Sequence, residues 1–126
     1  AGAGCEMKLI VNLALGLNRA VLAESLALAE SAGVDKQLAL DVMKSTVAYS
    51  AAMDTKGPKM VTGNFEPQAR LRQHLKDVLL ILEMGKKHEQ QLPLSSLHEE
   101  LLSSAVEKGL GELDNSAIIE LIRQLT

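Results

Sequence analysis

The sequence has very few aromatic residues: one Phe, one Tyr and no Trp in 126 residues. Because 47% of the residues are nonetheless hydrophobic, the core has to be built from Leu, Ala, Val, Ile and Met. These side chains suit helix packing, whereas aromatic and β-branched residues are enriched in strands. The sequence also lacks strand-like alternation of useful length and any repeat of solenoid period. We therefore predict an all-α fold, with residues 1–126 forming one domain around one core.

Cysteine and surplus charge are also scarce. Cys5 is the only cysteine, which excludes an internal disulfide and is typical of a reducing compartment such as the cytoplasm. Thirteen basic and sixteen acidic residues give a net charge of -3, which disfavours nucleic acid and anionic membranes as partners. The chain shows no signal-peptide pattern and starts on the glycine-rich residues 1–4, as a piece cut from a longer protein would.

A long helix is predicted for residues 6–31, because this segment has no proline, a single internal glycine (Gly16) and a glycine just after its end (Gly33). Apolar residues lie around almost its whole circumference, so we expect it to run through the middle of the domain. We take its most apolar stretch, residues 9–28, as too polar for a membrane span because of five interruptions: Asn12, Asn18, Arg19, Glu24 and Ser25.

Further helices are predicted by the same spacing and capping signals over residues 34–48, 50–61, 71–88, 93–109 and 114–125. Asp35 and Asp114 are placed to cap two of them, and Gly57-Pro58 should break the segment 50–61. Residues 62–67 read as a turn-rich link. The pattern predicts a helical bundle with short loops around one long central helix.

Lys8 and Asn12 introduce polar groups into the long apolar helix, one turn apart on one face. Burying an amine or an amide without partners costs several kcal/mol, so the pair should face solvent, a protein partner or a ligand. Gly16 continues this face and would let a backbone or a substrate approach closely. The simpler alternative is that Lys8 lies on a wet helix end and Asn12 bonds a neighbouring loop.

The position of Lys8 near the predicted helix start suggests a further role. The positive end of the helix dipole disfavours a cation there and should make the amine easier to deprotonate. A lysine that exchanges a proton readily suits general acid–base catalysis on an alcohol. By contrast, Lys76-Asp77 taken alone reads as a solvated helix face. The histidines His74, His88 and His98 have no metal-site spacing, so we expect surface or capping roles for them and no metal.

Several spaced motifs cover almost the whole chain: Gly2-x-Gly4-x-x-x-Lys8-x-x-x-Asn12, then Glu24 and Gly33, Phe65-x-Pro67, Lys76-Asp77, and Gly109-x-Gly111-x-x-Asp114-x-Ser116. In this order and spacing they resemble the C-terminal helical domain of the β-hydroxyacid dehydrogenases. That family includes 3-hydroxyisobutyrate dehydrogenase, tartronate semialdehyde reductase and, more distantly, 6-phosphogluconate dehydrogenase.

The resemblance implies roles for five residues. Lys8 would be the catalytic lysine, which relays the proton of the substrate hydroxyl while hydride passes to or from NAD or NADP. Asn12 and Gly4 would bind a small hydroxy acid. Lys76 and Asp77 would lie on the cofactor side. Members of the family pair through this domain, so we expect a homodimer or a tetramer.

Family members also carry a Rossmann domain ahead of the helical one, and no strand followed by G-x-G-x-x-G occurs here. The chain alone should therefore bind no whole dinucleotide and be inactive. Val11 replaces a second Asn and Ala69 replaces an aromatic residue of the family pattern, which leaves the choice of hydroxy acid open. The choice between NAD and NADP is open too, because the residues that select it lie in the Rossmann domain. A non-catalytic helical interaction module is the alternative.

Overall fold

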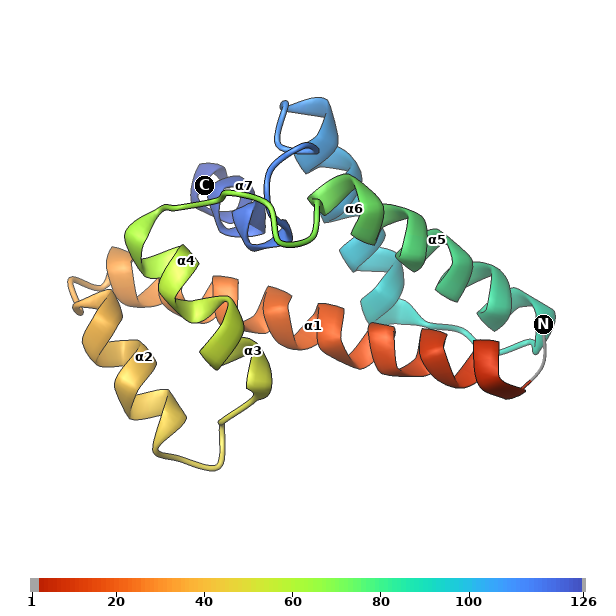
Figure 1. Cartoon of the computed structure of the whole chain (residues 1–126), viewed down its shortest axis with the longest axis horizontal. Helices are drawn as coiled ribbons and strands as arrows, with labels where there is room; N and C mark the ends of the chain where they lie inside the picture. Colours follow the sequence, from red (N-terminus) through yellow and green to blue (C-terminus); the bar gives the residue numbers. More distant parts are fainter. Residues whose placement is uncertain (1–2, 126) are drawn as a thin grey trace.

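Seven α-helices and one 3₁₀ turn make up the regular structure of residues 3–125, the part of the chain that the computed structural model describes (Figure 1). In chain order they are α1 (Ala3–Ser31), α2 (Lys36–Lys44), α3 (Ala51–Thr55), α4 (Gly57–Thr62), α5 (Leu71–Lys87), α6 (Pro93–Glu107), η1 (Asn115–Ala117) and α7 (Ile118–Gln124). Within these residues there is no strand, only an isolated bridge between Arg70 and Asp114. The predicted all-α fold is confirmed.

Helix α1 runs along the whole molecule and contacts each of the other six α-helices (Figure 1). Leu22, Ala23 and Leu26 on it are fully buried, so the core lies over its C-terminal half. By length and hydropathy α1 could cross a membrane. The prediction that its polar interruptions exclude a membrane span is therefore wrong on these two criteria. Its contacts with the other six α-helices make it the central helix, as predicted, although several of its apolar side chains are exposed, so core burial accounts for only part of its apolar character.

Helix α2 is shorter than predicted and ends at Lys44. The hydroxyls of Ser45 and Thr46 donate to the carbonyls of Val42 and Met43, and this local bonding replaces a further helical turn. At the other end of α2 the carboxylate of Asp35 accepts a hydrogen bond from the backbone N–H of Leu38 at 2.9 Å. The predicted cap is therefore confirmed.

The predicted break in residues 50–61 separates two short helices, α3 and α4. It occurs at Lys56, whose backbone ends one helix and begins the next. A Cβ on Gly57 would lie 2.8 Å from both methyl carbons of Leu40, so a glycine is needed there for α2 and α4 to pack closely.

Three side-chain contacts tie the ends of α1 to later elements. Near its start, Glu6 lies 2.8 Å from Nε2 of His88, just after α5. Near its end, Glu30 pairs with Arg123 of α7 at 3.1 Å and with Lys36 of α2 at 2.8 Å. Since α5 starts far from the first turn of α1 and ends beside it, the two helices run side by side in opposite directions (Figure 1).

Asp114 is the polar centre of the fold and is fully buried. Its carboxylate accepts hydrogen bonds from Nζ of Lys56 at 3.0 and 3.1 Å, and from the backbone N–H groups of Gln68 at 2.9 Å and Ala69 at 3.2 Å. It also accepts from the backbone and the hydroxyl of Ser116. Burial by itself raises the pKa of Asp114, but the hydrogen bonds from Ser116, Gln68 and Lys56 hold it well below its usual range.

These contacts extend the predicted role of Asp114. The residue caps η1, through which the last helical segment begins, so the cap itself is confirmed. The same side chain also fixes residues 68–69 of the link between α4 and α5, while the backbone of Asp114 donates to the carbonyl of Phe65 at 2.9 Å. Three segments that are remote in sequence therefore meet on one carboxylate.

We expect Asp114→Asn to destabilise the domain by about 3–5 kcal/mol, because it leaves the buried ammonium of Lys56 without a counter-charge. The double variant Lys56→Met/Asp114→Asn should recover part of this loss. Lys44→Met is the matched control, since Lys44 pairs with Asp54 at 3.0 Å on the exposed surface and its loss should change stability by less than about 1 kcal/mol. Denaturant unfolding of the three variants measures these differences; equal effects of Asp114→Asn and Lys44→Met would contradict the central role of Asp114.

Candidate functional site

A polar stripe follows one face of α1. Lys8, Asn12 and Arg19 are separated by four and seven residues, which places all three on the same side of the helix. Lys8 is exposed, and none of the hydrogen bonds or ion pairs within residues 3–125 engages its amine. Because α1 begins at Ala3, Lys8 lies in its second turn, where the field of the helix end is weaker than the sequence analysis assumed.

The stripe borders a cavity of about 160 Å³ where α1, the link after α4, the first turns of α5 and η1 meet; we call it the polar pocket. Its lining consists of Asn12, Leu15, Arg19, Ala69, Arg70, Gln73, His74, Asp77 and Asn115. Asn12 and Asp77, which the sequence analysis placed at the site separately, therefore line one pocket. Lys8 lies one helical turn beyond Asn12.

The two other predicted site residues do not line this pocket. Lys76 is exposed on α5, next to the half-buried Asp77. Gly4 is exposed in the first turn of α1, with open space where a Cβ would stand. A contact of either residue with a ligand stays a prediction.

The wall of the polar pocket is set by the Asp114 centre. The backbone of Ala69 donates to Asp114, and the backbone of Asn115 donates to the carbonyl of Ala69 at 2.8 Å. These bonds fix the small side chain of Ala69 and the amide of Asn115 at the pocket. The substitution of an aromatic residue by Ala69, noted in the sequence, therefore falls in the lining itself.

Two histidines are buried beneath the pocket, which corrects their predicted surface or capping roles. His74 is 7% exposed and His98 is 3% exposed, with ring centroids 5.3 Å apart. Burial, together with the charge of Arg19, lowers the pKa of His74 to about 3 and that of His98 to about 4, so both are neutral near pH 7. Their sequence signal was available, since each occupies a core position of its helix, with His74 three residues after the buried Leu71 and four before Val78.

Gly16 accommodates these histidines. A Cβ at this position would lie 2.2 Å from Nε2 of His74 and 3.1 Å from Cε1 of His98. The close approach that the sequence suggested is thus made by two side chains of α5 and α6, not by a backbone or a substrate. The missing Cβ lets α5 pack against α1 beside the polar pocket.

Arg19 is the functional candidate that the sequence analysis missed. Its Nε and Nη1 are enclosed and have no hydrogen-bond partner. Burial lowers the pKa of its guanidinium, while the nearby charge of Asp114 acts in the opposite direction. The sequence analysis counted Arg19 only as an interruption of an apolar stretch, although its spacing from Asn12 already placed it on the face of Lys8.

Comparison with known proteins now identifies the domain. Residues 2–122 match the family model described as "NAD-binding of NADP-dependent 3-hydroxyisobutyrate dehydrogenase". The chain belongs to this family. The resemblance inferred from the spaced motifs is therefore confirmed, and so is the use of NAD(P) by the family.

Individual relatives agree with this assignment. The chain is 32% identical to glyoxylate/succinic semialdehyde reductase 1 of Arabidopsis thaliana over 97% of its own length and 42% of that protein. It is 34% identical to the cytokine-like nuclear factor N-PAC of Aedes aegypti over 93% of its length and 21% of that protein. The crystal structure of a 3-hydroxyisobutyrate dehydrogenase from Salmonella typhimurium superposes with a TM-score of 0.92 at 31% identity, covering 95% of this chain and 42% of that one. The chain thus spans less than half the length of these relatives.

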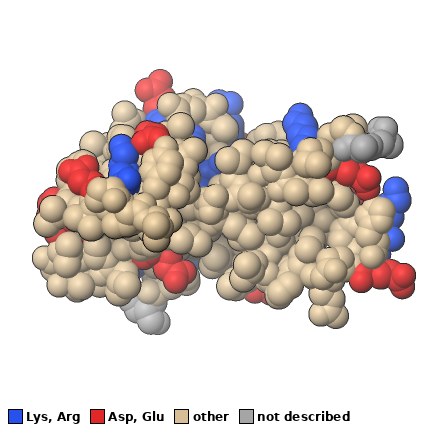
Figure 2. Space-filling view, turned by 90° about the horizontal axis from the view of Figure 1, so that it is seen from below, with Lys and Arg blue, Asp and Glu red and all other residues tan. Residues whose placement is uncertain are grey.

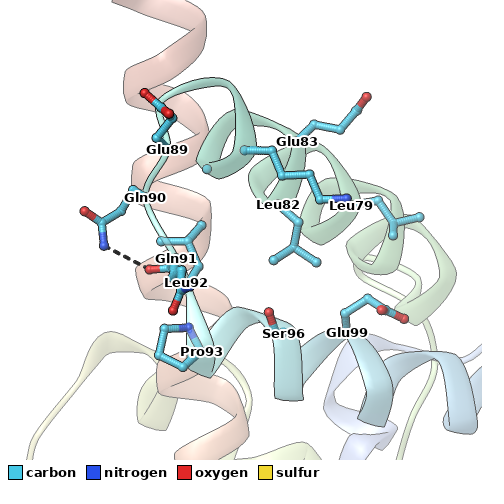
Figure 3. Close-up of a pocket in the computed structure, with 12 residues that line it drawn as sticks. Leu79, Leu82, Glu83, Glu89, Gln90, Gln91, Leu92, Pro93, Ser96 and Glu99 are labelled. Carbon is cyan, nitrogen blue, oxygen red and sulfur yellow. Dashed lines mark hydrogen bonds between the residues drawn. The ribbon is translucent and has the colours of Figure 1, made fainter.

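A larger cavity of this dehydrogenase-family domain lies elsewhere. A groove of about 840 Å³ separates α5 from α6 and is closed at one end by the link 88–92 (Figure 3). Leu79 and Leu82 line it from α5, and Ser96 and Glu99 face them from α6 (Figure 3). None of the predicted site residues lies in its lining. The smaller polar pocket, next to Lys8, is therefore the candidate functional site.

We expect Gly16→Ala to destabilise the domain by about 1–3 kcal/mol, because the new methyl group collides with the buried ring of His74. In a His74→Ala background, Gly16→Ala should cost less stability than in the wild type, since the colliding ring is gone. Gly4→Ala is the matched control on the same helix: it meets nothing within 4 Å and should be neutral or slightly stabilising. Thermal and denaturant unfolding measure these effects, and a neutral Gly16→Ala would show that the glycine is not needed for helix packing.

Proposed function

We propose that this chain is the domain that supplies the catalytic lysine and part of the substrate site of an NAD(P)-dependent oxidoreductase, which interconverts a small 3-hydroxy acid and its semialdehyde. One observation carries the proposal: Lys8 and Asn12 share a face of α1, and Asn12 and Asp77 line one pocket. Membership of the 3-hydroxyisobutyrate dehydrogenase family supports it.

In this proposal Lys8 handles the proton of the reacting alcohol. When the hydroxy acid is oxidised, the hydroxyl proton passes to Nζ of Lys8 as hydride leaves the carbon, and the reverse transfer accompanies reduction. The amine is exposed and makes no hydrogen bond or ion pair with residues 3–125, so a substrate can reach it. The half-buried amide of Asn12 lies one turn along the helix and orients the hydroxyl or the neighbouring carboxylate.

The residues of this chain fit only the nicotinamide end of the cofactor. Residues 3–125 contain no strand, and therefore no strand followed by a glycine-rich turn that would hold the phosphates. They offer the exposed amine of Lys76 and the half-buried carboxylate of Asp77 beside Asn12. NAD(P), when bound, accepts or supplies the hydride, and in this proposal a separate Rossmann domain holds most of it. The Arabidopsis relative is more than twice as long as the matched region, which leaves room for such a domain.

A second face of α1 supports self-association. Ile10, Val21 and Leu28 are exposed at 50%, 63% and 70%, and their spacing of eleven and seven residues places them on one side, about half a turn from the face of Lys8. Val21 and Leu28 line an apolar groove of about 270 Å³ that continues onto Leu94 and Leu97 of α6. Figure 2, a view from the side of α1, shows a broad area without charged side chains. We propose that this face is covered in a homodimer or a tetramer, because monomers rarely expose large apolar patches.

The alternative function is a non-catalytic helical module. It is favoured by the relative from Aedes aegypti, which is named as a nuclear factor and not as an enzyme, at 34% identity. A module of this kind would need the fold and the apolar face of α1, but not the amine of Lys8. The two functions therefore differ in what a substitution of Lys8 does.

In the full-length protein, we expect Lys8→Met to lower kcat for hydroxy-acid oxidation by about 10²- to 10⁴-fold, since it removes the general acid–base group. The melting temperature should stay nearly unchanged, because the side chain is exposed and unpaired. Lys87→Met is the control: this lysine is also exposed, in the last turn of α5, and its loss should leave kcat intact. Unchanged turnover in Lys8→Met would favour the non-catalytic module.

We also expect the full-length protein to be dimeric or tetrameric in light scattering. The variant Val21→Glu/Leu28→Glu should dissociate it while leaving the helical circular-dichroism spectrum intact, because both side chains are exposed within a single chain. Val47→Glu is the control, since Val47 is fully exposed in the link after α2, away from this face. A monomeric wild-type protein at high concentration would refute the assembly.

A further inference from the structure

Arg19 is a cation that the fold encloses without giving it a partner. None of the hydrogen bonds or ion pairs within residues 3–125 uses its guanidinium, and both Nε and Nη1 are cut off from solvent. An enclosed charge without hydrogen bonds costs the folded state several kcal/mol. Its Nη2 is not among the enclosed atoms, so this corner of the guanidinium is open at the polar pocket that Arg19 lines.

The nearby carboxylates do not balance this charge. Asp114 is saturated by Lys56, Ser116 and two backbone N–H groups. Asp77 is the only carboxylate in the lining of the polar pocket. Among the ion pairs within residues 3–125 none joins it to Arg19, and its one contact is with the ring of His74 at 4.0 Å, which is neutral at pH 7.

The remaining lining is suited to an anion. Arg70 adds a second guanidinium, which pairs with Glu112 at 3.2 Å on the exposed side. The lining residues alone carry a formal charge of +1, from two arginines and one aspartate, and Glu112 outside the lining balances that of Arg70. Asn115 also lines the pocket, and its Oδ1 is enclosed without a hydrogen-bond partner.

We propose that the polar pocket binds a second carboxylate of the substrate, remote from the reacting carbon, and that Arg19 is the residue that selects for it. This inference rests on the proposed function and adds the substrate class: hydroxy acids with two carboxylates. The open Nη2 of Arg19 can donate a charge-assisted hydrogen bond to an oxygen of this carboxylate, and the guanidinium supplies the positive charge.

The order of residues along α1 places this carboxylate farther from the reacting carbon than the carboxylate next to the hydroxyl. Arg19 lies seven residues from Asn12 and eleven from Lys8, which is about 10 Å and about 16 Å of helix axis. Asn12 and Arg19 line the same pocket and Lys8 does not, so a substrate group held by Asn12 lies between the reacting carbon at Lys8 and the guanidinium of Arg19. The pocket of about 160 Å³ equals the volume of about five water molecules, which is enough for a carboxylate with one or two methylene groups.

Steady-state kinetics on the full-length protein test the proposal with a matched pair of substrates. 2-(Hydroxymethyl)adipate carries a terminal carboxylate where 2-(hydroxymethyl)hexanoate has a methyl group. The wild-type protein should prefer the dicarboxylate about 10- to 100-fold in kcat/KM, mainly through KM, as expected for one charge-assisted contact. Arg19→Met should abolish this preference and keep kcat for the monocarboxylate. Arg123→Met, which removes an arginine of α7 outside the pocket, should keep the preference.

Two results would overturn the selection by Arg19. The first is a wild-type protein without preference between the two substrates. The second is an equal loss on both substrates in Arg19→Met, which would assign Arg19 to the carboxylate beside the hydroxyl or to the structure alone.

Melting temperatures separate this inference from the proposed function, because they need no turnover. Adipate should raise the melting temperature of the wild-type protein by a few degrees, whereas hexanoate should not, and Arg19→Met should remove the effect. Arg19→Met without ligand should melt at the same or a higher temperature, since an unpaired enclosed charge is lost. If neither substrate turns over but adipate still stabilises the protein through Arg19, only the dehydrogenase function fails. If adipate has no effect, or Arg19→Met melts several degrees lower, the carboxylate site fails.

Discussion

The buried contact between Lys56 and Asp114 organises the rest of the domain. One carboxylate receives the ammonium of Lys56, two backbone N–H groups of the link after α4, and the backbone and hydroxyl of Ser116. A buried ion pair stabilises a fold only when its remaining hydrogen-bonding capacity is satisfied, and here it is. Because the same contact fixes Ala69 and Asn115, the wall of the polar pocket depends on a charge pair that is not itself part of the lining.

Two enclosed cations of the domain have opposite environments, and the contrast assigns their roles. Lys56 has a complete set of acceptors, with Gln68 completing it at 3.1 Å, so it belongs to the structure. Arg19 has none among the described residues, and it lies in the lining of a pocket. Unsatisfied charge is costly in a folded protein and is tolerated mainly where a ligand completes it. Because His74 and His98 are neutral near pH 7, they add no positive charge beside Arg19.

Helix α1 combines three functions on three sides. Its C-terminal half carries the core residues Leu22 and Leu26, its polar stripe borders the candidate site, and its apolar stripe stays exposed. This explains why the segment is apolar around almost its whole circumference and yet only partly buried in the single chain. In the proposed enzyme, the surfaces that α1 leaves open are those that a Rossmann domain and a second copy would cover.

The sequence by itself determined which segments are helical, the caps at Asp35 and Asp114, and the shared helix face of Lys8 and Asn12, because capping and helical spacing act within a few residues; it did not determine the start of α1 or the end of α2. Motif order along the chain also determined the family. Only the tertiary structure decided which side chains meet: that Asp77 joins Asn12 in one pocket, that Gly16 makes room for His74, and that Arg19 is enclosed without a partner. These contacts join α1 to segments 50 to 100 residues later in the chain, and the burial that costs Arg19 its hydration exists only once those segments have packed together.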